Sequence, residues 1–263
     1  GRDQGGRRSS SPLLSQETRE GRQGGGKKEA VLREWAGRTG FITFVIVQRM
    51  DATASPNFNV VAHPLIEDCL RRLRDVATPT AGFREAARLL TQLLMVEATR
   101  DLPLAETRIE TPLEITRAWR LDADMVLVPV LRSGLAMLDT ATSMFPAARV
   151  GFIGLERDEA TAIARGYYQK LPEPLAGATV MILEPMLATG GSACATLDRV
   201  MEAGVRDVRV VCTVAAPEGV AAVAARHPRC AIHTAALDRG LNDRKYIVPG
   251  LGDFGDRYFG TTT

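Results

Sequence analysis

The chain has 263 residues, of which 45% are apolar and 24% charged, a balance typical of a folded protein with a full core. Its formal charge of +2 is unevenly divided: residues 1–49 hold 10 Lys and Arg against five acids, and the remainder hold 23 against 26. Such a mildly acidic body argues against a nucleic-acid groove. The mostly apolar stretch at residues 41–47 is too short to cross a bilayer. We therefore expect neither nucleic acid nor a membrane among its partners.

Four cysteines are spread along the chain, at positions 69, 194, 212 and 230, and no two form a C-x-x-C pair. This spacing predicts neither a disulfide framework nor a zinc site, and we expect no metal held by protein ligands alone. Free cysteines suit a reducing compartment, so the expected location is cytoplasmic.

The first 40 residues are rich in Gly, Arg, Ser and Gln and lack periodicity, which predicts disorder. Met50 stands just before the first sequence with a folded pattern. We expect residues 1–49 to be a disordered or non-native N-terminal extension, and residues 50–263 to form one domain.

Apolar spacing then predicts alternating helices and strands. Phe83, Ala87, Leu90 and Leu94 mark one face of a helix that runs into Glu97. Uniformly apolar runs predict buried strands at residues 125–130, 150–155, 180–183, 208–214 and 231–237. This alternation predicts an α/β fold with a parallel-rich central sheet flanked by helices. In such folds ligands bind at the carboxyl ends of the strands.

A candidate anion-binding turn follows the strand at residues 180–183. Glu184 and Pro185 end that strand, and residues 187–192 (Leu-Ala-Thr-Gly-Gly-Ser) lead into a helix that begins near Gly191. Glycines let the backbone approach a phosphate, and the first N–H groups of the helix point at it. A carboxylate would repel a phosphate, so Glu184 belongs against sugar hydroxyls. The turn alone does not distinguish this reading from an incidental glycine-containing loop.

Three motifs in order give the chain a family resemblance from about His63 to Thr261. Residues 184–192 read E-P-M-L-A-T-G-G-S, residues 129–134 read P-V-L-R-S-G, and residues 246–257 read Y-I-V-P-G-L-G-D-F-G-D-R. They resemble the ribose-phosphate, pyrophosphate and uracil motifs of uracil phosphoribosyltransferases. The resemblance implies a type I phosphoribosyltransferase fold over residues 50–263, with a small uracil-binding hood.

In that family, uracil and phosphoribosyl pyrophosphate (PRPP) give UMP and diphosphate in pyrimidine salvage. The resemblance implies catalytic roles for Arg132 and Asp253. It implies PRPP contacts from Arg132, Arg157, Glu184, Pro185, Met186, Leu187, Ala188, Thr189, Gly190, Gly191, Ser192 and Asp253, and uracil contacts from Ile247, Gly252, Asp253 and Phe254. It also implies Mg²⁺ bound with PRPP, GTP as an activator, and a homodimer or higher homo-oligomer.

Four residues depart from the family pattern: Ser133 replaces an Ala, Val96 replaces a Tyr, and two further departures concern the site itself. Glu184 stands where the family usually has Asp, and Phe254 replaces an Ala and should crowd or cap the base pocket. The alternative reading is therefore a catalytically weak or inactive relative that binds uracil, UMP or PRPP as a regulatory protein. An RNA-binding pyrimidine regulator is disfavoured by the acidic body and by Pro185.

Overall fold

The computed structural model of this protein describes residues 57–157 and 164–261, within a compact unit that spans Ala52–Thr263. The expected N-terminal extension and Met50 lie outside the described residues. None of the helices that the structure describes is long and apolar enough to span a membrane.

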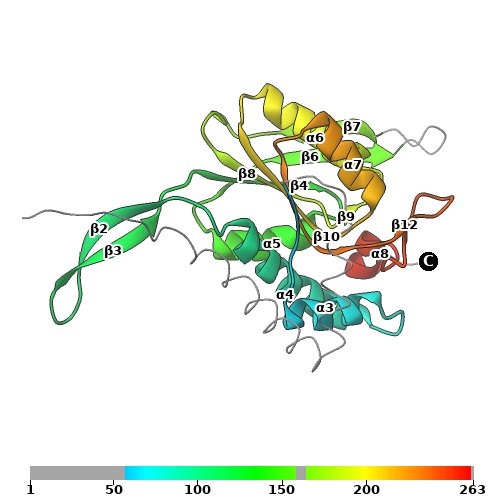
Figure 1. Cartoon of the computed structure of the whole chain (residues 1–263), viewed down its shortest axis with the longest axis horizontal. Coiled ribbons are helices and arrows are strands. Elements are labelled where there is room, and N and C mark those ends of the chain that lie inside the picture. The colour runs from blue at the N-terminus through cyan, green and yellow to red at the C-terminus, as the bar shows by residue number, and fades with distance from the viewer. Residues whose placement is uncertain (1–56, 158–163, 262–263) are drawn as a thin grey trace, which may run out of the picture. The chain divides into compact units, whose positions relative to one another are not determined.

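A mostly parallel sheet forms the centre of this unit (Figure 1). Its neighbours pair in parallel from one edge as far as β6, and the last pair, β6 and β7, is antiparallel. The strands in spatial order are β1 (Phe58–Val60), β11 (Ala231–Leu237), β10 (Asp207–Ala215), β8 (Thr179–Leu183), β4 (Met125–Leu131), β6 (Phe152–Arg157) and β7 (Ala164–Lys170), with β5 (Arg149–Val150) beside β4 and β9 (Met186–Leu187) beside β10.

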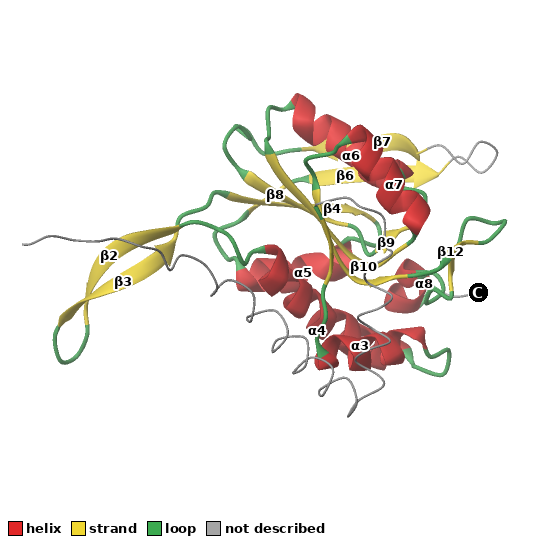
Figure 2. Cartoon of the chain, in the orientation of Figure 1, coloured by secondary structure: helices red, strands yellow, loops and turns green. Residues whose placement is uncertain are grey.

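Helices cover both faces of the sheet (Figure 2). One face carries three helices, α3 (Pro64–Arg74), α4 (Thr80–Ala98) and α5 (Leu135–Met144), and the other carries α6 (Gly191–Glu202) and α7 (Pro217–Arg226). The α/β architecture expected from the sequence is therefore confirmed.

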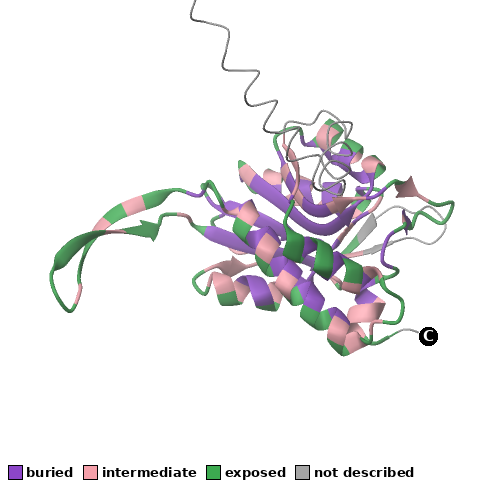
Figure 3. Ribbon diagram, turned by 60° about the horizontal axis from the view of Figure 1, so that its bottom comes forward, coloured by how far each residue is buried: buried purple, intermediate pink, exposed green. Residues whose placement is uncertain are grey.

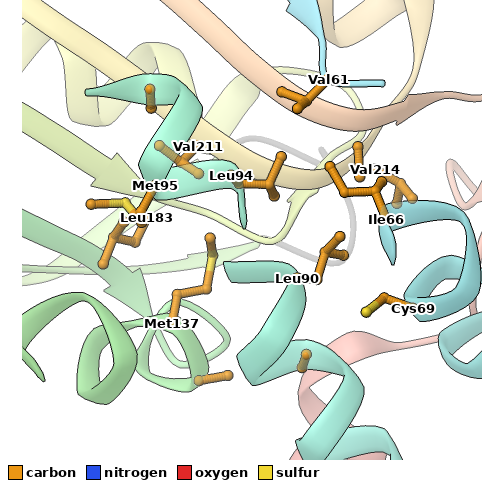
Figure 4. Packing of buried hydrophobic residues seen from close by; sticks show 14 of the residues in the cluster. Val61, Ile66, Cys69, Leu90, Leu94, Met95, Met137, Leu183, Val211 and Val214 are labelled. Carbon is orange, nitrogen blue, oxygen red and sulfur yellow. The ribbon is translucent and has the colours of Figure 1, made fainter. Parts of the chain in front are cut away.

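Alternation along each strand explains why both faces are apolar. Met125 and Leu127 of β4 join the cluster under α3, α4 and α5, whereas Val126 and Val128 join the cluster under α6 and α7. In the first cluster Leu90, Leu94 and Met95 of α4 pack with Leu183 and Val211 of the sheet (Figure 4). Burial on both faces is the physical reason that these strands have uniformly apolar sequences.

An arm that the sequence pattern did not predict extends from this unit. The antiparallel hairpin of β2 (Leu104–Glu110) and β3 (Ile115–Leu121) projects beyond the helices, and most of its residues are exposed (Figure 3). Its strands are interrupted by charged residues, so they lack the apolar runs that identify buried strands. The expected strand at residues 150–155 is instead two strands, β5 and β6, on either side of Gly151.

The C-terminal segment, residues 238–261, forms a small unit that we call the hood. It contains the two-stranded sheet of β12 (Gly240–Leu241) and β13 (Ile247–Val248), followed by α8 (Phe254–Phe259). The ring of Phe254 is 1% exposed and packs edge-on against Phe83 of α4, with centroids 5.2 Å apart. The expectation that this ring crowds the base pocket is wrong, because the start of α8 turns the side chain into the apolar core.

Candidate active site

Two of the three motifs meet at the carboxyl edge of the central sheet. Strands β4 and β8 are parallel neighbours, with Pro129 opposite Leu183, so Arg132 and Glu184 follow adjacent strand ends. Gly134 lies directly against the end of β8, where a Cβ would collide with the carbonyl oxygen of Leu183. Only glycine permits this approach, which holds the Arg132 turn against the strand that carries Glu184.

The Arg132 turn also contacts the hood. The Arg132 guanidinium lies 3.6 Å from Asp256 of α8, and its side chain is 66% exposed. Ser133 lies near Gly255. The Asp253 side chain caps α8 by accepting a hydrogen bond from the N–H of Asp256 at 2.9 Å. The structure therefore brings the Arg132 turn and the start of α8, which Asp253 caps, together from segments more than 100 residues apart.

The predicted anion cradle forms the start of α6. Gly190 precedes the helix with φ at +79°, a left-handed conformation that favours glycine. Thr189 and Gly191 are exposed, and the Thr189 hydroxyl accepts a weak bond from the N–H of Gly191 at 3.4 Å. The next N–H groups have no partner within the helix because they belong to its first turn. An anion at this point would accept hydrogen bonds from these N–H groups, and the positive end of the helix dipole would stabilise its charge.

A second glycine supports the cradle from the neighbouring helix. Gly219, in the first turn of α7, leaves no room for a Cβ beside the carbonyl oxygens of Leu187 and Ala188, at 2.8 and 2.6 Å. A Cβ on Gly190 would in turn lie 2.9 Å from the Gly219 carbonyl oxygen. The close packing of α7 against the turn thus fixes its conformation. In the sequence, the only sign of this role is a glycine after Pro217 and Glu218.

Glu184 is the most unusual group of the site. It is 6% exposed, and its Oε2 has no hydrogen-bond partner in the described structure. Burial raises the pKa of Glu184 to about 7, and a side-chain hydrogen bond from Ser192 acts in the opposite direction. A buried oxygen without a partner costs about 1–3 kcal/mol, which a donor from a ligand would recover. The carboxyl group is therefore prepared to accept hydroxyl groups beside the cradle.

The remaining residues of the turn link the cradle to the sheet. The Pro185 carbonyl accepts the N–H groups of Thr213 and Val214 in β10, at 2.9 and 3.2 Å. Met186 and Leu187 form β9, which pairs with β10, and Ala188 is half-buried. Four of the twelve predicted PRPP contacts thus have structural roles in the backbone that shapes the turn.

The predicted base-binding residues lie along the hood. Ile247 is buried in β13, whereas Gly252 is exposed with φ at +80° and precedes the exposed Asp253. These residues frame a backbone segment that runs toward Arg132. Arg157 is the last residue of β6, and its side chain lies outside the described structure.

Three residues that the sequence analysis did not assign support the hood. Arg74 at the end of α3 and the buried Asp238 after β11 form a bidentate ion pair. Arg257 of α8 donates to the Leu251 carbonyl oxygen at 2.8 Å. A signal existed for Asp238, because it is an acid directly after a buried strand at the ligand-binding edge of the sheet.

The comparisons with known proteins agree with this geometry. Residues 60–261 match the family model described as uracil phosphoribosyltransferase. The chain belongs to this family. It is 48% identical over 202 residues to the uracil phosphoribosyltransferase of Wolinella succinogenes, covering 76% of this chain and 97% of the relative. It is also 48% identical over 206 residues to that of Caulobacter vibrioides, covering 78% and 99%.

A solved structure shows the same fold. The AQ2163 protein from Aquifex aeolicus is 35% identical, with a TM-score of 0.75 over 78% of this chain and 99% of that chain. The type I phosphoribosyltransferase fold implied by the sequence motifs is thereby confirmed for this member of the uracil phosphoribosyltransferase family.

Proposed function

We propose that this protein transfers the phosphoribosyl group of PRPP to uracil, giving UMP and diphosphate in pyrimidine salvage. The observation that carries the proposal is the meeting of three motifs at one sheet edge: the Arg132 turn, the Glu184–Ser192 turn and the hood. In the reaction a bond forms between uracil N1 and the anomeric carbon as the bond from that carbon to the pyrophosphate oxygen breaks. The N1 proton leaves to solvent or a base.

Each part of the site has a task in this reaction. The α6 cradle binds the 5-phosphate, and Glu184 accepts the ribose hydroxyls beside it. Arg132 can hold two oxygens of the departing pyrophosphate with its planar fork, which stabilises the charge that develops there. Asp253 is exposed at the start of α8, near the Arg132 turn, and is the candidate to face the sugar as positive charge develops on it.

Magnesium enters this scheme with the substrate. Mg²⁺ keeps several waters and binds substrate phosphates with one or two carboxylates in many sites. Among the described residues there is no cluster of three or more acids, histidines or cysteines that could hold a metal ion. We propose that the ion binds together with PRPP, where it would supply neutralising charge on the pyrophosphate.

Backbone groups of the hood are proposed to select the base. The N3–H and 4-oxo edge of uracil presents donors and acceptors opposite to those of cytosine at the same positions. A site with fixed N–H and C=O groups rejects the wrong base because buried polar groups are then left unpaired. Ile247 to Phe254 contains such a segment, with Gly252 exposed at its turn.

The test is an assay of the purified full chain with uracil, PRPP and magnesium. UMP and diphosphate should form in equal amounts, and cytosine should be a poor substrate. A folded protein that binds PRPP but makes no UMP would instead establish the regulatory alternative. Adding GTP to the same assay tests the activation that the family resemblance implies. The four buried, free cysteines favour a cytoplasmic location.

The arm supports our proposal that the protein is a homodimer or higher homo-oligomer. In the register of the hairpin, Leu104 lies opposite Leu121, Glu106 opposite Trp119, Arg108 opposite Arg117 and Glu110 opposite Ile115, so these apolar and charged side chains share one face. The apolar members of this face are 40–69% exposed in the single chain. Such a surface on a projecting hairpin is typical of a contact with another copy.

Replacing Trp119 with Ser should shift the assembly toward smaller species by removing the largest apolar side chain on this face. Sedimentation velocity over a range of protein concentrations measures the shift. Thr107→Ser, on the opposite face of the hairpin, is the matched control and should leave the distribution unchanged. An unaltered distribution for the Trp119 variant would contradict this role of the arm.

A further inference from the structure

A buried ion pair holds the backbone of the hood at its centre. Asp238 has a side chain 4% exposed and receives both terminal nitrogens of Arg74, at 2.6 and 2.9 Å. The same Arg74 donates to the carbonyl oxygen of Gly250 at 2.8 Å, and the N–H of Gly250 donates to Asp238 at 2.8 Å. Both backbone polar groups of one hood residue are therefore bound by one ion pair.

Gly250 is the point at which this pair can set the direction of the hood backbone. Its φ is +62°, and a Cβ there would collide with the carbonyl oxygen of Ile247. The adjacent carbonyl, that of Leu251, accepts a bond from Arg257. Two successive residues between Ile247 and Gly252 are thus fixed by charged side chains rather than by a regular helix or strand.

Arg257 connects the same segment to helix α3. Its guanidinium donates to the carbonyl oxygens of Leu73 and Asp75, and lies 4.5 Å from the centre of the Phe83 ring. Burial lowers the pKa of Arg257, which an arginine tolerates because its ordinary value is so high. Arg74 and Arg257 therefore anchor the hood to the last turn of α3, near the C-terminus of the described chain (Figure 1).

We infer that Arg74 and Asp238 are positioning residues for base recognition. This inference rests on the proposed function, in which the hood reads uracil through backbone groups. Main-chain N–H and C=O groups cannot change direction by adopting another rotamer. Their orientation toward a base therefore depends on the side chains that hold the backbone in place. A displacement of about 1 Å can reduce catalysis on the order of 10²-fold. The ion pair supplies that support without touching the substrate.

Arg74→Lys and Asp238→Asn test the inference in the full-length protein. Lysine carries the charge but cannot bind both Asp238 oxygens and the Gly250 carbonyl in a planar fork. Asparagine keeps the shape but loses one acceptor and the charge. We expect the KM for uracil to rise about 10-fold and the preference for uracil over cytosine to fall, with the KM for PRPP within about twofold of the wild type.

Arg71→Lys is the matched control, since Arg71 lies one turn earlier on α3 and pairs with Asp68 at the exposed surface. Its KM values should equal those of the wild type. If the wild type makes UMP and both variants keep its uracil KM and base preference, the inference is wrong and the proposed function stands. Equal losses for uracil and PRPP would also overturn it, as they would indicate a general structural role. If the wild type makes no UMP, the proposed function and this inference fall together. Arg74→Lys decides the matter if Asp238→Asn does not fold.

Discussion

Arg132→Lys should lower kcat/KM for PRPP about 10²-fold, and Arg132→Ala about 10³-fold, the range found when a donor to a developing anion is removed. The guanidinium is 66% exposed, and its separation of 3.6 Å from Asp256 indicates a weak ion pair in the free protein. A pyrophosphate group offers more negative charge and better geometry, so Arg132 can transfer to the substrate at little cost. Lysine keeps the charge but loses bidentate contact.

Asp256→Asn separates substrate binding from support of the hood. If Arg132 acts only by holding α8, this variant should reproduce the loss; we expect kcat/KM within about threefold of the wild type, as for loss of a weak surface pair. Arg226→Lys, an equivalent change at an exposed arginine paired with Asp198, should have no effect. Steady-state kinetics with both substrates varied would measure all four variants. Full activity of Arg132→Ala would remove Arg132 from the mechanism.

Glu184→Gln should change how the stability of the free protein depends on pH. Burial raises the pKa of Glu184 from its ordinary value of 4.5 to about 7. The native state therefore binds a proton more tightly than the unfolded state. The stabilising contribution of the protonated group is complete below pH 4.5, and is lost as pH rises to 7. The full difference corresponds to about 3 kcal/mol.

Urea unfolding at pH 5 and pH 8 measures this effect. The gain in unfolding free energy of Glu184→Gln over the wild type should be about 2.5 kcal/mol larger at pH 8 than at pH 5, because glutamine never needs to be buried with a charge. Ser192→Ala removes the hydrogen bond that lowers the pKa of Glu184, so the loss of stability should move to higher pH. The control is Glu202→Gln, which replaces an exposed acid on α6, the helix that carries Ser192. This variant should follow the wild-type profile. A Glu184→Gln profile parallel to the wild type would show that folding does not raise the pKa of Glu184.

The sequence predicted those parts of the fold that depend on local pattern. Strands β4, β8 and β10 are buried on both faces, so their apolar runs identify them without tertiary information. The turn at residues 184–192 was recognisable because its glycines and hydroxyls are contiguous. The arm was missed because its alternation is broken by charge, and its stability does not come from burial within this chain.

The features that the sequence did not predict depend on contacts between residues far apart in the chain. Arg74 and Asp238 are separated by 164 positions, and neither has a local pattern that names its partner. The direction of the Phe254 side chain depends on the start of α8 and the space beside Phe83, which no motif records. The sequence motif predicted that Glu184 faces sugar hydroxyls. It could not show that the carboxyl group is buried or that Oε2 has no partner, because both depend on the surrounding strands.

The buried ring of Phe254 affects how the hood can move. Because this residue is 1% exposed and belongs to the same apolar cluster as α3, α4 and α5, α8 cannot separate from the domain without breaking its core. Regions that share a core open together, at close to the free energy of global unfolding. Helix α8 is therefore a fixed part of the domain. The tip between β12 and β13, residues 242–246, is exposed and has no such tie to the core.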